Sequence, residues 1–228
     1  LIYLGDDYSV QERFFRHYYN AFKDPLNVPF RKDEDKKKDP LGPVATRSNL
    51  IQIYEKLINQ DAKHHLQAIR SAGQLYALML ARNTDEAWAP LDKPLKDLDR
   101  IQGAPSYLLM LYLLVRREAL GIDVAQLEEI ARLLVCFFVR RNLTDTPPTR
   151  DLTRLFMATI DKVAELSGGA VVKTARDELL AVSASDETFH SKLEGAIYEE
   201  NAGVTRFVLC ALAEQSMTKE TWVDLWKY

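Results

Sequence analysis

The sequence has few cysteines, no long apolar run and no secretory opening. Only 2 of its 228 residues are cysteines. Cys136 and Cys210 both lie within apolar helical patterns, so we expect two buried free thiols and a cytoplasmic protein. No stretch of about twenty apolar residues is present, and we therefore expect no membrane-spanning helix. The chain opens on Leu1 without a signal peptide, which leads us to expect a fragment of a longer cytoplasmic protein.

The sequence motifs of common catalytic and cofactor sites are also missing. The chain contains no GxGxxG, GxxxxGK[ST], CxxC or GxSxG pattern. Its 4 histidines are scattered apart from one adjacent pair, His64 and His65. Neighbouring side chains point about 100° apart on a helix, so this pair cannot face one metal ion. We therefore expect no catalytic, cofactor-binding or metal-binding residue in this chain.

An excess of positive charge is missing as well. The chain has 30 Lys and Arg against 33 Asp and Glu, a formal net charge of −3 and a pI of about 5.9. Such a surface does not attract nucleic acid over its whole extent, so any contact with DNA must be local. The densest charge run lies within residues 24–43, which contain 4 prolines. We expect a solvated, mobile loop there, with a phosphate-tracking loop as the alternative.

Strong helical periodicity is what the sequence does contain, most clearly in residues 123–166. Asp123 and Gln126 have the spacing of a capping box, and the prolines at 147 and 148 separate two helical patterns. We predict an antiparallel helix pair here. The residues that repeat at three- and four-residue spacing are Leu127, Ile130, Ala131, Leu134, Val135 and Phe138, then Leu152, Leu155, Phe156, Thr159, Ile160 and Val163.

The remaining chain predicts further helices around this pair. Ser9 and Glu12 form a capping-box pattern, which predicts a helix from there to about residue 23. Residues 46–82 predict a long helix broken once, with Ile58 and Leu66 among its core positions. Residues 105–121 are apolar on nearly every side and predict a central buried helix. The other predicted segments are short elements at 83–105, helices at 171–182, 186–193 and 203–213, and a final turn capped by Thr218 that carries Trp222 and Trp226.

These patterns together predict the fold class. No strand-like alternation persists beyond a few residues, and no internal repeat is visible. We predict an all-α protein, an irregular multi-helix bundle around the antiparallel central pair. Residues 1–228 should form a single helical domain.

Four arginines gather where the two central helices meet and form the one polar cluster that suggests a binding site. Arg140, Arg141, Arg150 and Arg154, the arginine joint, could bind DNA phosphates through their guanidinium groups. The alternative is structural. Arg140 and Arg141 end a helix, where a cation is stabilised by the helix dipole, and acidic neighbours offer ion pairs. We favour the structural role and keep DNA-phosphate contact open.

Three segments resemble the middle helical region of the ParB-like/HNH proteins related to the GmrSD modification-dependent restriction endonucleases. The middle segment FFVRRNLTDTPPTRDLTRLF resembles the block that follows a long helix in that family. The opening DDYSVQERFFRHYYNAF resembles the aromatic helix that follows the ParB-like domain. The ending TRFVLCALAEQSMTKETWVDLWKY resembles the helix that precedes the nuclease motif. The three occur in the family's order and span nearly the whole chain.

The resemblance implies a non-catalytic linker or scaffold domain of a bacterial, phage-defence enzyme. Its partners would be the flanking ParB-like and HNH domains of the same polypeptide. The NTP and the divalent metal would bind to those domains, and DNA would be reached through the parent protein, an NTP-dependent endonuclease. The alternative function is a stand-alone helical module that binds a protein partner through an apolar groove. Neither function gives this chain a catalytic residue of its own.

Overall fold

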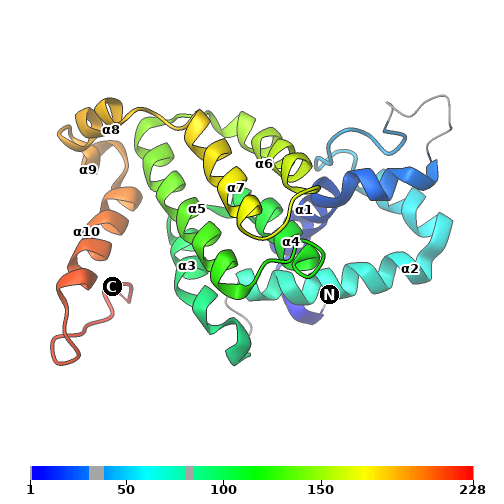
Figure 1. Cartoon of the computed structure of the whole chain (residues 1–228), viewed down its shortest axis with the longest axis horizontal. Coiled ribbons are helices and arrows are strands. Elements are labelled where there is room, and N and C mark those ends of the chain that lie inside the picture. The colour runs from blue at the N-terminus through cyan, green and yellow to red at the C-terminus, as the bar shows by residue number, and fades with distance from the viewer. Residues whose placement is uncertain (1, 31–38, 81–84, 228) are drawn as a thin grey trace.

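The computed structural model describes residues 2–30, 39–80 and 85–227, and every regular element in this part of the chain is helical (Figure 1). The predicted all-α bundle is confirmed. No strand occurs among these residues, and none of their helices has the length and apolar character needed to cross a membrane. The elements are η1 (Ile2–Leu4), α1 (Tyr8–Asn27), η2 (Val28–Phe30), α2 (Leu50–Met79), η4 (Glu86–Trp88), α3 (Ala89–Arg100), η5 (Ala104–Ser106), α4 (Tyr107–Arg116), α5 (Val124–Thr144), α6 (Thr149–Val163), α7 (Gly169–Val182), α8 (Asp186–Leu193), α9 (Ile197–Glu200) and α10 (Ala202–Ser216).

Helix α4 lies at the centre of the core. Its residues from Tyr107 to Leu114 are all buried, and it packs against α1, α2, α5 and α6. A helix that is apolar on every side can be stable only when neighbours cover it all round. The prediction of a central buried helix is therefore confirmed. One contiguous set of buried apolar residues runs from Leu4 to Phe207 around it.

Helices α5 and α6 both form, but they are not the predicted antiparallel pair at the centre of the bundle: they touch mainly through Phe137, Phe138 and Phe156, and α4 takes the central place. The capping box is present, because the Asp123 carboxylate accepts from Gln126 N–H at 2.8 Å and Gln126 Oε1 accepts from Asp123 N–H at 3.0 Å. The stacked rings of Phe138 and Phe156 lie 6.3 Å apart between centroids. Away from the turn the two helices separate: α5 packs mainly on α3 and α7, and α6 on α7 and α4.

The N-terminal helix α1 differs from its prediction at both ends. Asp7, not Ser9, is the N-cap, and its carboxylate accepts from Ser9 N–H at 2.8 Å. The helix also continues past residue 23 to Asn27. Phe22 has non-helical angles of φ −121° and ψ 20° and kinks the helix. Pro25 then falls within the first turn after the kink, a position where the missing N–H of proline costs nothing.

The predicted loop 24–43 is shorter and better packed than expected. Its first residues belong to α1 and η2, and residues 31–38 lie outside the described part of the chain. Leu41 is buried, and its N–H donates to Oδ1 of the buried Asn27 at 3.0 Å. Ala45 N–H donates to Asn20 Oδ1 at 2.7 Å. These contacts hold residues 41–45 against α1, so this end of the segment is not a solvated, mobile connector.

Residues 83–105 contain a helix that the sequence reasoning missed. Prolines at 90 and 94 favoured short elements, yet α3 runs through both. Pro90 lies in the first turn, where proline is tolerated, and Pro94 is buried with Leu91, Leu95 and Leu98 on the face toward the core. Among the described helices, α3 and α5 are the two that pack most extensively on each other. Burial of its leucine face therefore outweighs the lost hydrogen bond at Pro94.

Helix α2 is long and broken once, as predicted. The break is at Asp61, whose φ of −153° and ψ of 87° are extended rather than helical. The Asp61 carboxylate accepts from His64 N–H at 3.0 Å, so the same residue caps the helical stretch after the break. We call residues 50–60 the first limb of α2 and residues 62–79 its second limb. Figure 1 shows the bend between them at one end of the molecule.

Candidate functional site

Two of the four predicted site arginines are used inside the fold. Arg140 donates to Ala184 O at 2.9 Å and to the Asp186 carboxylate at 2.6 Å, and its guanidinium lies 4.8 Å from the centre of the Phe189 ring. It therefore joins α5 to the start of α8. Arg141 donates to Pro147 O at 3.1 Å and holds the turn that leads into α6. These contacts fit a structural role for Arg140 and Arg141 rather than a role in binding DNA phosphates.

The other two arginines face solvent on the first turns of α6. Arg150 keeps 85% of its side chain exposed, and its closest acidic group is Asp151 at 3.9 Å. Arg154 is exposed and has no ion pair among the described residues. The two lie four residues apart, on one face of the helix. The structure thus separates the arginine joint into a structural pair and an exposed pair.

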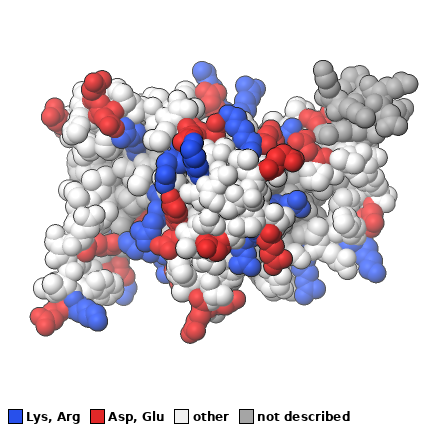
Figure 2. Space-filling view, in the orientation of Figure 1, with Lys and Arg blue, Asp and Glu red and all other residues white. Residues whose placement is uncertain are grey.

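The surface charges elsewhere are mixed. Figure 2 shows lysines and arginines interspersed with aspartates and glutamates over the face in view. Many of them are paired, as in Lys162 with Glu178 at 2.6 Å and Lys173 with Asp177 at 2.6 Å. The expectation that any DNA contact must be local therefore applies to the exposed arginine pair.

A large apolar groove lies at the opposite end of the molecule from α10, inside the bend of α2. Its hollow measures about 1010 Å³, at the upper limit of the usual range for small-molecule sites. One wall is the first limb of α2, with Ile51, Tyr54 and Ile58, and the other is the second limb, with Leu66. Phe15 of α1 lies in the groove lining and packs edge-on against Tyr54, with ring centroids 4.8 Å apart.

Several large apolar side chains in this groove remain exposed. Tyr8 is 84% exposed, Ile51 72% and Leu66 53%. Ile58 is also exposed, so the prediction that Ile58 and Leu66 belong to the core is wrong. The bend at Asp61 explains the difference, because the two limbs diverge from it and these side chains border the hollow instead of packing against another helix. Contiguous exposed apolar surface of this kind marks a binding site for an apolar partner.

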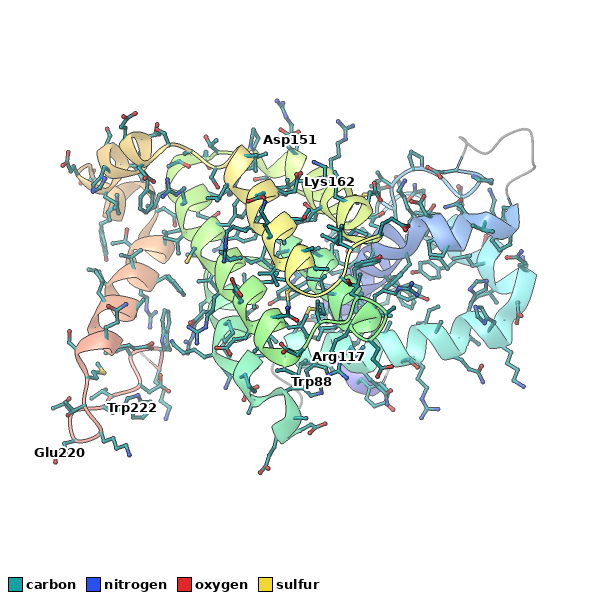
Figure 3. The ribbon with its side chains drawn as sticks, in the orientation of Figure 1. Trp88, Arg117, Asp151, Lys162, Glu220 and Trp222 are labelled. Carbon is teal, nitrogen blue, oxygen red and sulfur yellow. The ribbon has the colours of Figure 1, made fainter. Side chains whose placement is uncertain are left out.

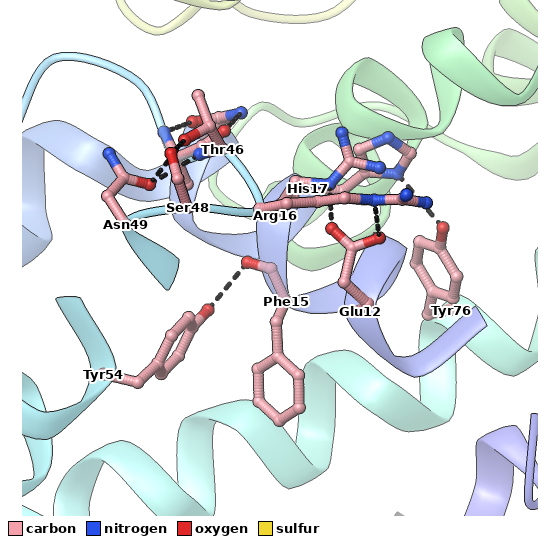
Figure 4. A network of polar contacts seen from close by, with 12 residues as sticks. Glu12, Phe15, Arg16, His17, Thr46, Ser48, Asn49, Tyr54 and Tyr76 are labelled. Atoms are coloured by element: carbon pink, nitrogen blue, oxygen red, sulfur yellow. Dashed lines mark hydrogen bonds and ion pairs between the residues drawn. The ribbon is translucent and has the colours of Figure 1, made fainter. Parts of the chain in front are cut away.

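A polar network beneath the groove fixes the first limb on α1 (Figure 4). The Tyr54 hydroxyl donates to Phe15 O at 2.8 Å. The Glu12 carboxylate forms ion pairs with Arg16 of the same helix and with Arg47, the latter at 3.2 Å. Arg47 precedes the first limb, so this ion pair and the tyrosine hydroxyl together set the position of the limb over α1.

His17 lies in the same network and is buried. Its Nδ1 is 3.0 Å from the Tyr76 hydroxyl of the second limb. Burial lowers the pKa of His17 to about 3, and the positive charges of Arg16 and Arg13 act in the same direction. Burial also raises the pKa of Tyr76 above its usual value. Both groups are therefore neutral at physiological pH and serve as a buried hydrogen bond between α1 and α2.

A second hollow, of about 740 Å³, lies between α3 and the residues after α10. Trp226 holds this segment in place: its indole N–H donates to Glu214 Oε1 at 2.7 Å, and the Arg100 guanidinium lies 4.0 Å from the centre of its ring. Trp222, labelled in Figure 3, is 66% exposed at the rim. A turn is present at Thr218, closed by Thr221 N–H donating to Thr218 O at 3.1 Å, but it carries neither of the two tryptophans that were predicted to lie in it.

The described residues contain no group of three or more His, Cys, Asp or Glu that could hold a metal ion. The rings of His64 and His65 lie 5.4 Å apart at a steep angle. Both cysteines are free, as predicted, but neither is buried: Cys136 is exposed and Cys210 half-buried. Cys136 lies on the outer side of α5, opposite the buried face that carries Leu134 and Phe138. Its apolar neighbours in the sequence do not share its face of the helix.

The chain was compared with models of protein families, with curated proteins and with solved structures, and none of the three comparisons finds a match.

Proposed function

We propose that this chain is the non-catalytic helical domain that links a ParB-like NTP-binding domain and an HNH nuclease domain in a GmrSD-like restriction endonuclease. The resemblance of three segments in the family's order supports this. The observation that carries the proposal is the use of Arg140 and Arg141. Both belong to the middle segment, and both bind neighbouring backbone rather than facing a pocket. A motif that holds helices together suits a linking domain.

In this role the domain keeps its neighbours at a fixed separation and transmits nucleotide-dependent movement between them. The NTP and the divalent metal bind in the flanking domains, and the chain itself supplies no catalytic group. We assign any DNA contact made by this domain to Arg150 and Arg154. Their guanidinium groups are exposed on one face of α6, as phosphate binding requires.

The proposal is tested on the full-length reading frame. We expect an NTP-binding domain before this chain and an HNH motif after it, and NTP-dependent cleavage of modified DNA by the whole protein. Arg140→Ala should uncouple NTP hydrolysis from cleavage, whereas Arg132→Ala, on the outside of the same helix, should not. A reading frame without either flanking domain would refute the proposal.

The DNA contact is tested separately by a salt titration of binding to duplex DNA. Two phosphate contacts contribute a slope of about −1.8 in log K against log salt, because each releases about 0.9 counterions. Arg150→Ala with Arg154→Ala should remove that contribution. The matched control is Lys56→Ala with Lys63→Ala, two exposed cations on α2. An unchanged slope in the arginine variant would show that these residues do not meet DNA.

The apolar groove favours a second candidate function, a helical module that binds another polypeptide. Exposed Ile51 and Ile58 lie seven residues apart on one face of the first limb, opposite Leu66. A groove of this form accepts an amphipathic helix. Binding of an apolar fluorescent dye tests whether the groove is open: Ile51→Glu should abolish it, and Leu209→Glu, at an exposed leucine on α10, should not. Equal dye binding by the two variants would remove this candidate.

A further inference from the structure

The hollow between α3 and the segment after α10 is lined by three carboxylates, and two of them are engaged within the fold. Glu214 pairs with Lys93 of α3 at 2.8 Å and also accepts from the indole N–H of Trp226. Asp224 accepts from the backbone N–H of Trp226 at 3.1 Å. These two negative groups therefore serve to hold the segment in place.

Two lysines that line the same hollow are not engaged. Lys96 lies on the α3 wall and Lys219 on the opposite wall; both are exposed, and neither forms an ion pair with another described residue. The third carboxylate, Asp92, lies on the first turn of α3, where the helix dipole stabilises it, and it forms no ion pair with Lys96 one turn further on. The hollow thus offers two positive groups on opposite walls against one negative group.

The two tryptophans of the hollow differ in the same way. The ring of Trp226 lies 4.0 Å from the Arg100 guanidinium and packs on Phe207, with ring centroids 5.7 Å apart. Trp222 has no such neighbour in the described part of the chain and is largely exposed. Figure 3 places Trp222 on the inner side of the segment after α10 and Glu220 at its outer tip. The hollow therefore contains one indole ring whose faces are free.

We propose that this hollow binds one nucleotide unit of a single-stranded nucleic acid, with the base stacked on Trp222 and the two adjoining phosphates held by Lys96 and Lys219. Single-strand binding combines aromatic rings, on which bases stack, with cations that follow the backbone. Every base has a flat face, so such a site accepts any sequence. The hollow measures about 740 Å³, within the usual range for small-molecule sites, and one nucleotide is a molecule of that class.

Other anionic partners would use only part of this site. A duplex keeps its bases stacked inside, so it can meet the lysines but reaches the ring of Trp222 only if a base is flipped out. An acidic peptide also meets the lysines and has no flat group for the indole. The site is separate from the exposed arginines, because Figure 1 shows α6 on a different side of the molecule from the segment after α10. The inference therefore goes beyond the linking function and the duplex contact proposed above.

The stacking is tested by the fluorescence anisotropy of a labelled oligo(dT) strand mixed with the purified chain at low salt. Trp222→Ala should weaken binding by about ten-fold or more, the effect of losing one stacked base. Trp222→Phe should keep most of the affinity, since a phenyl ring also stacks. The matched control is Tyr198→Ala, at an exposed aromatic residue of α9, which should leave binding unchanged.

The phosphate contacts are tested by a salt titration of the same binding. Lys96→Ala with Lys219→Ala should make the slope of log K against log salt shallower by about 1.4, because each phosphate contact on a single strand contributes about 0.7. Lys56→Ala with Lys63→Ala, at two exposed cations on α2, should leave the slope unchanged. Circular dichroism should be the same for all variants.

Several results would overturn the inference. They are the absence of strand binding at low salt, equal binding by Trp222→Ala and the unmodified chain, and a poly-glutamate peptide that competes as well as the strand. Thymidine monophosphate that competes as well as the strand would also overturn it, because the site would then take a free nucleotide. Trp222→Ala should leave duplex binding unchanged, so a failure here is distinguishable from a failure of the contact proposed for Arg150 and Arg154.

Discussion

The middle of the molecule and its C-terminal end are held in place by different interactions. Around α4, stability comes from side chains buried on every side of a helix. Helix α10 buries only Val204, Thr205 and Phe207, and leaves Leu209 and Leu212 exposed. The chain after it is held mainly by Trp226, which donates to Glu214, lies against Arg100 and packs on the ring of Phe207. Dense apolar packing makes a region cooperative, whereas a region held by separate contacts can open locally.

Truncation of an aromatic side chain should separate the two regions most clearly. Phe138→Ala, beneath the turn between α5 and α6, should lower the free energy of unfolding by about 3–5 kcal/mol. Phe207→Ala on α10 should lower it by less, because the end of the chain can open around the change. Urea denaturation followed by circular dichroism measures both values. Equal losses would show that α10 belongs to the same cooperative unit as the middle.

The buried histidine of α1 should give the interior a pH dependence. The pKa of His17 is about 3 in the folded chain. The unfolded chain binds this proton below about pH 6.5, so the stability is complete above that pH and falls as the pH decreases toward 3. The loss is about 1.4 kcal/mol per pH unit within this window. Denaturation at several pH values should show that the free energy of unfolding depends less steeply on pH in His17→Asn. The control is His190→Asn, at an exposed residue of α8, which should keep the part of the pH dependence that comes from His17.

Arg140 joins α5 to the start of α8, and its removal should lower the free energy of unfolding less than Phe138→Ala does. Arg140→Ala removes the bonds to Ala184 O and the Asp186 carboxylate. A hydrogen bond to a charged group contributes about 1.5–3 kcal/mol, and the exposure of Asp186 places this one at the lower end. Hydrogen exchange should increase in α8 and not in α4. Arg154→Ala, at an exposed arginine on α6, should change neither rate.

The smallest effect is expected at the C-terminal segment. Trp226→Ala should lower the global free energy of unfolding by about 1 kcal/mol or less, because the segment can open without the core. Limited proteolysis after residue 216 should nevertheless become much faster. Trp222→Ala serves as the control, since that ring is largely exposed. Equal protection in the two variants would show that Trp226 does not hold the segment.

Much of the fold could be predicted from the spacing of apolar residues, because the burial of those residues determines which helices form and which faces they pack. The stripe on α5, the capping box at Asp123 and the apolar helix α4 all appear where the spacing of residues placed them. Local sequence signals were less informative for elements whose formation depends on tertiary contacts. Helix α3 forms through Pro94 because its leucines are buried on α5, and no property of residues 83–105 alone reports that.

The groove could not be predicted, since a helical pattern does not state what covers its apolar face. Ile58 and Leu66 repeat at core spacing and are nevertheless exposed. The signal that existed was the single break predicted in the long helix of residues 46–82. The four residues of the arginine joint have different surroundings: Arg140 and Arg141 are bonded within the fold, and Arg150 and Arg154 are exposed. Its division into a structural and an exposed pair depends on α8, which the sequence did not place beside α5.

The break at Asp61 makes the first limb of α2 a short lever. An unbroken helix of 30 residues would be a rod about 45 Å long, whereas the first limb alone extends about 17 Å from the bend. A rotation of about 10° at that one residue moves the far end of the limb by about 3 Å. The ion pair between Arg47 and Glu12 acts near that far end, where its leverage on the limb is greatest. Together with the Tyr54 hydroxyl bonded to Phe15 O, these two side chains set how far the limb stands from α1, and thus the width of the groove.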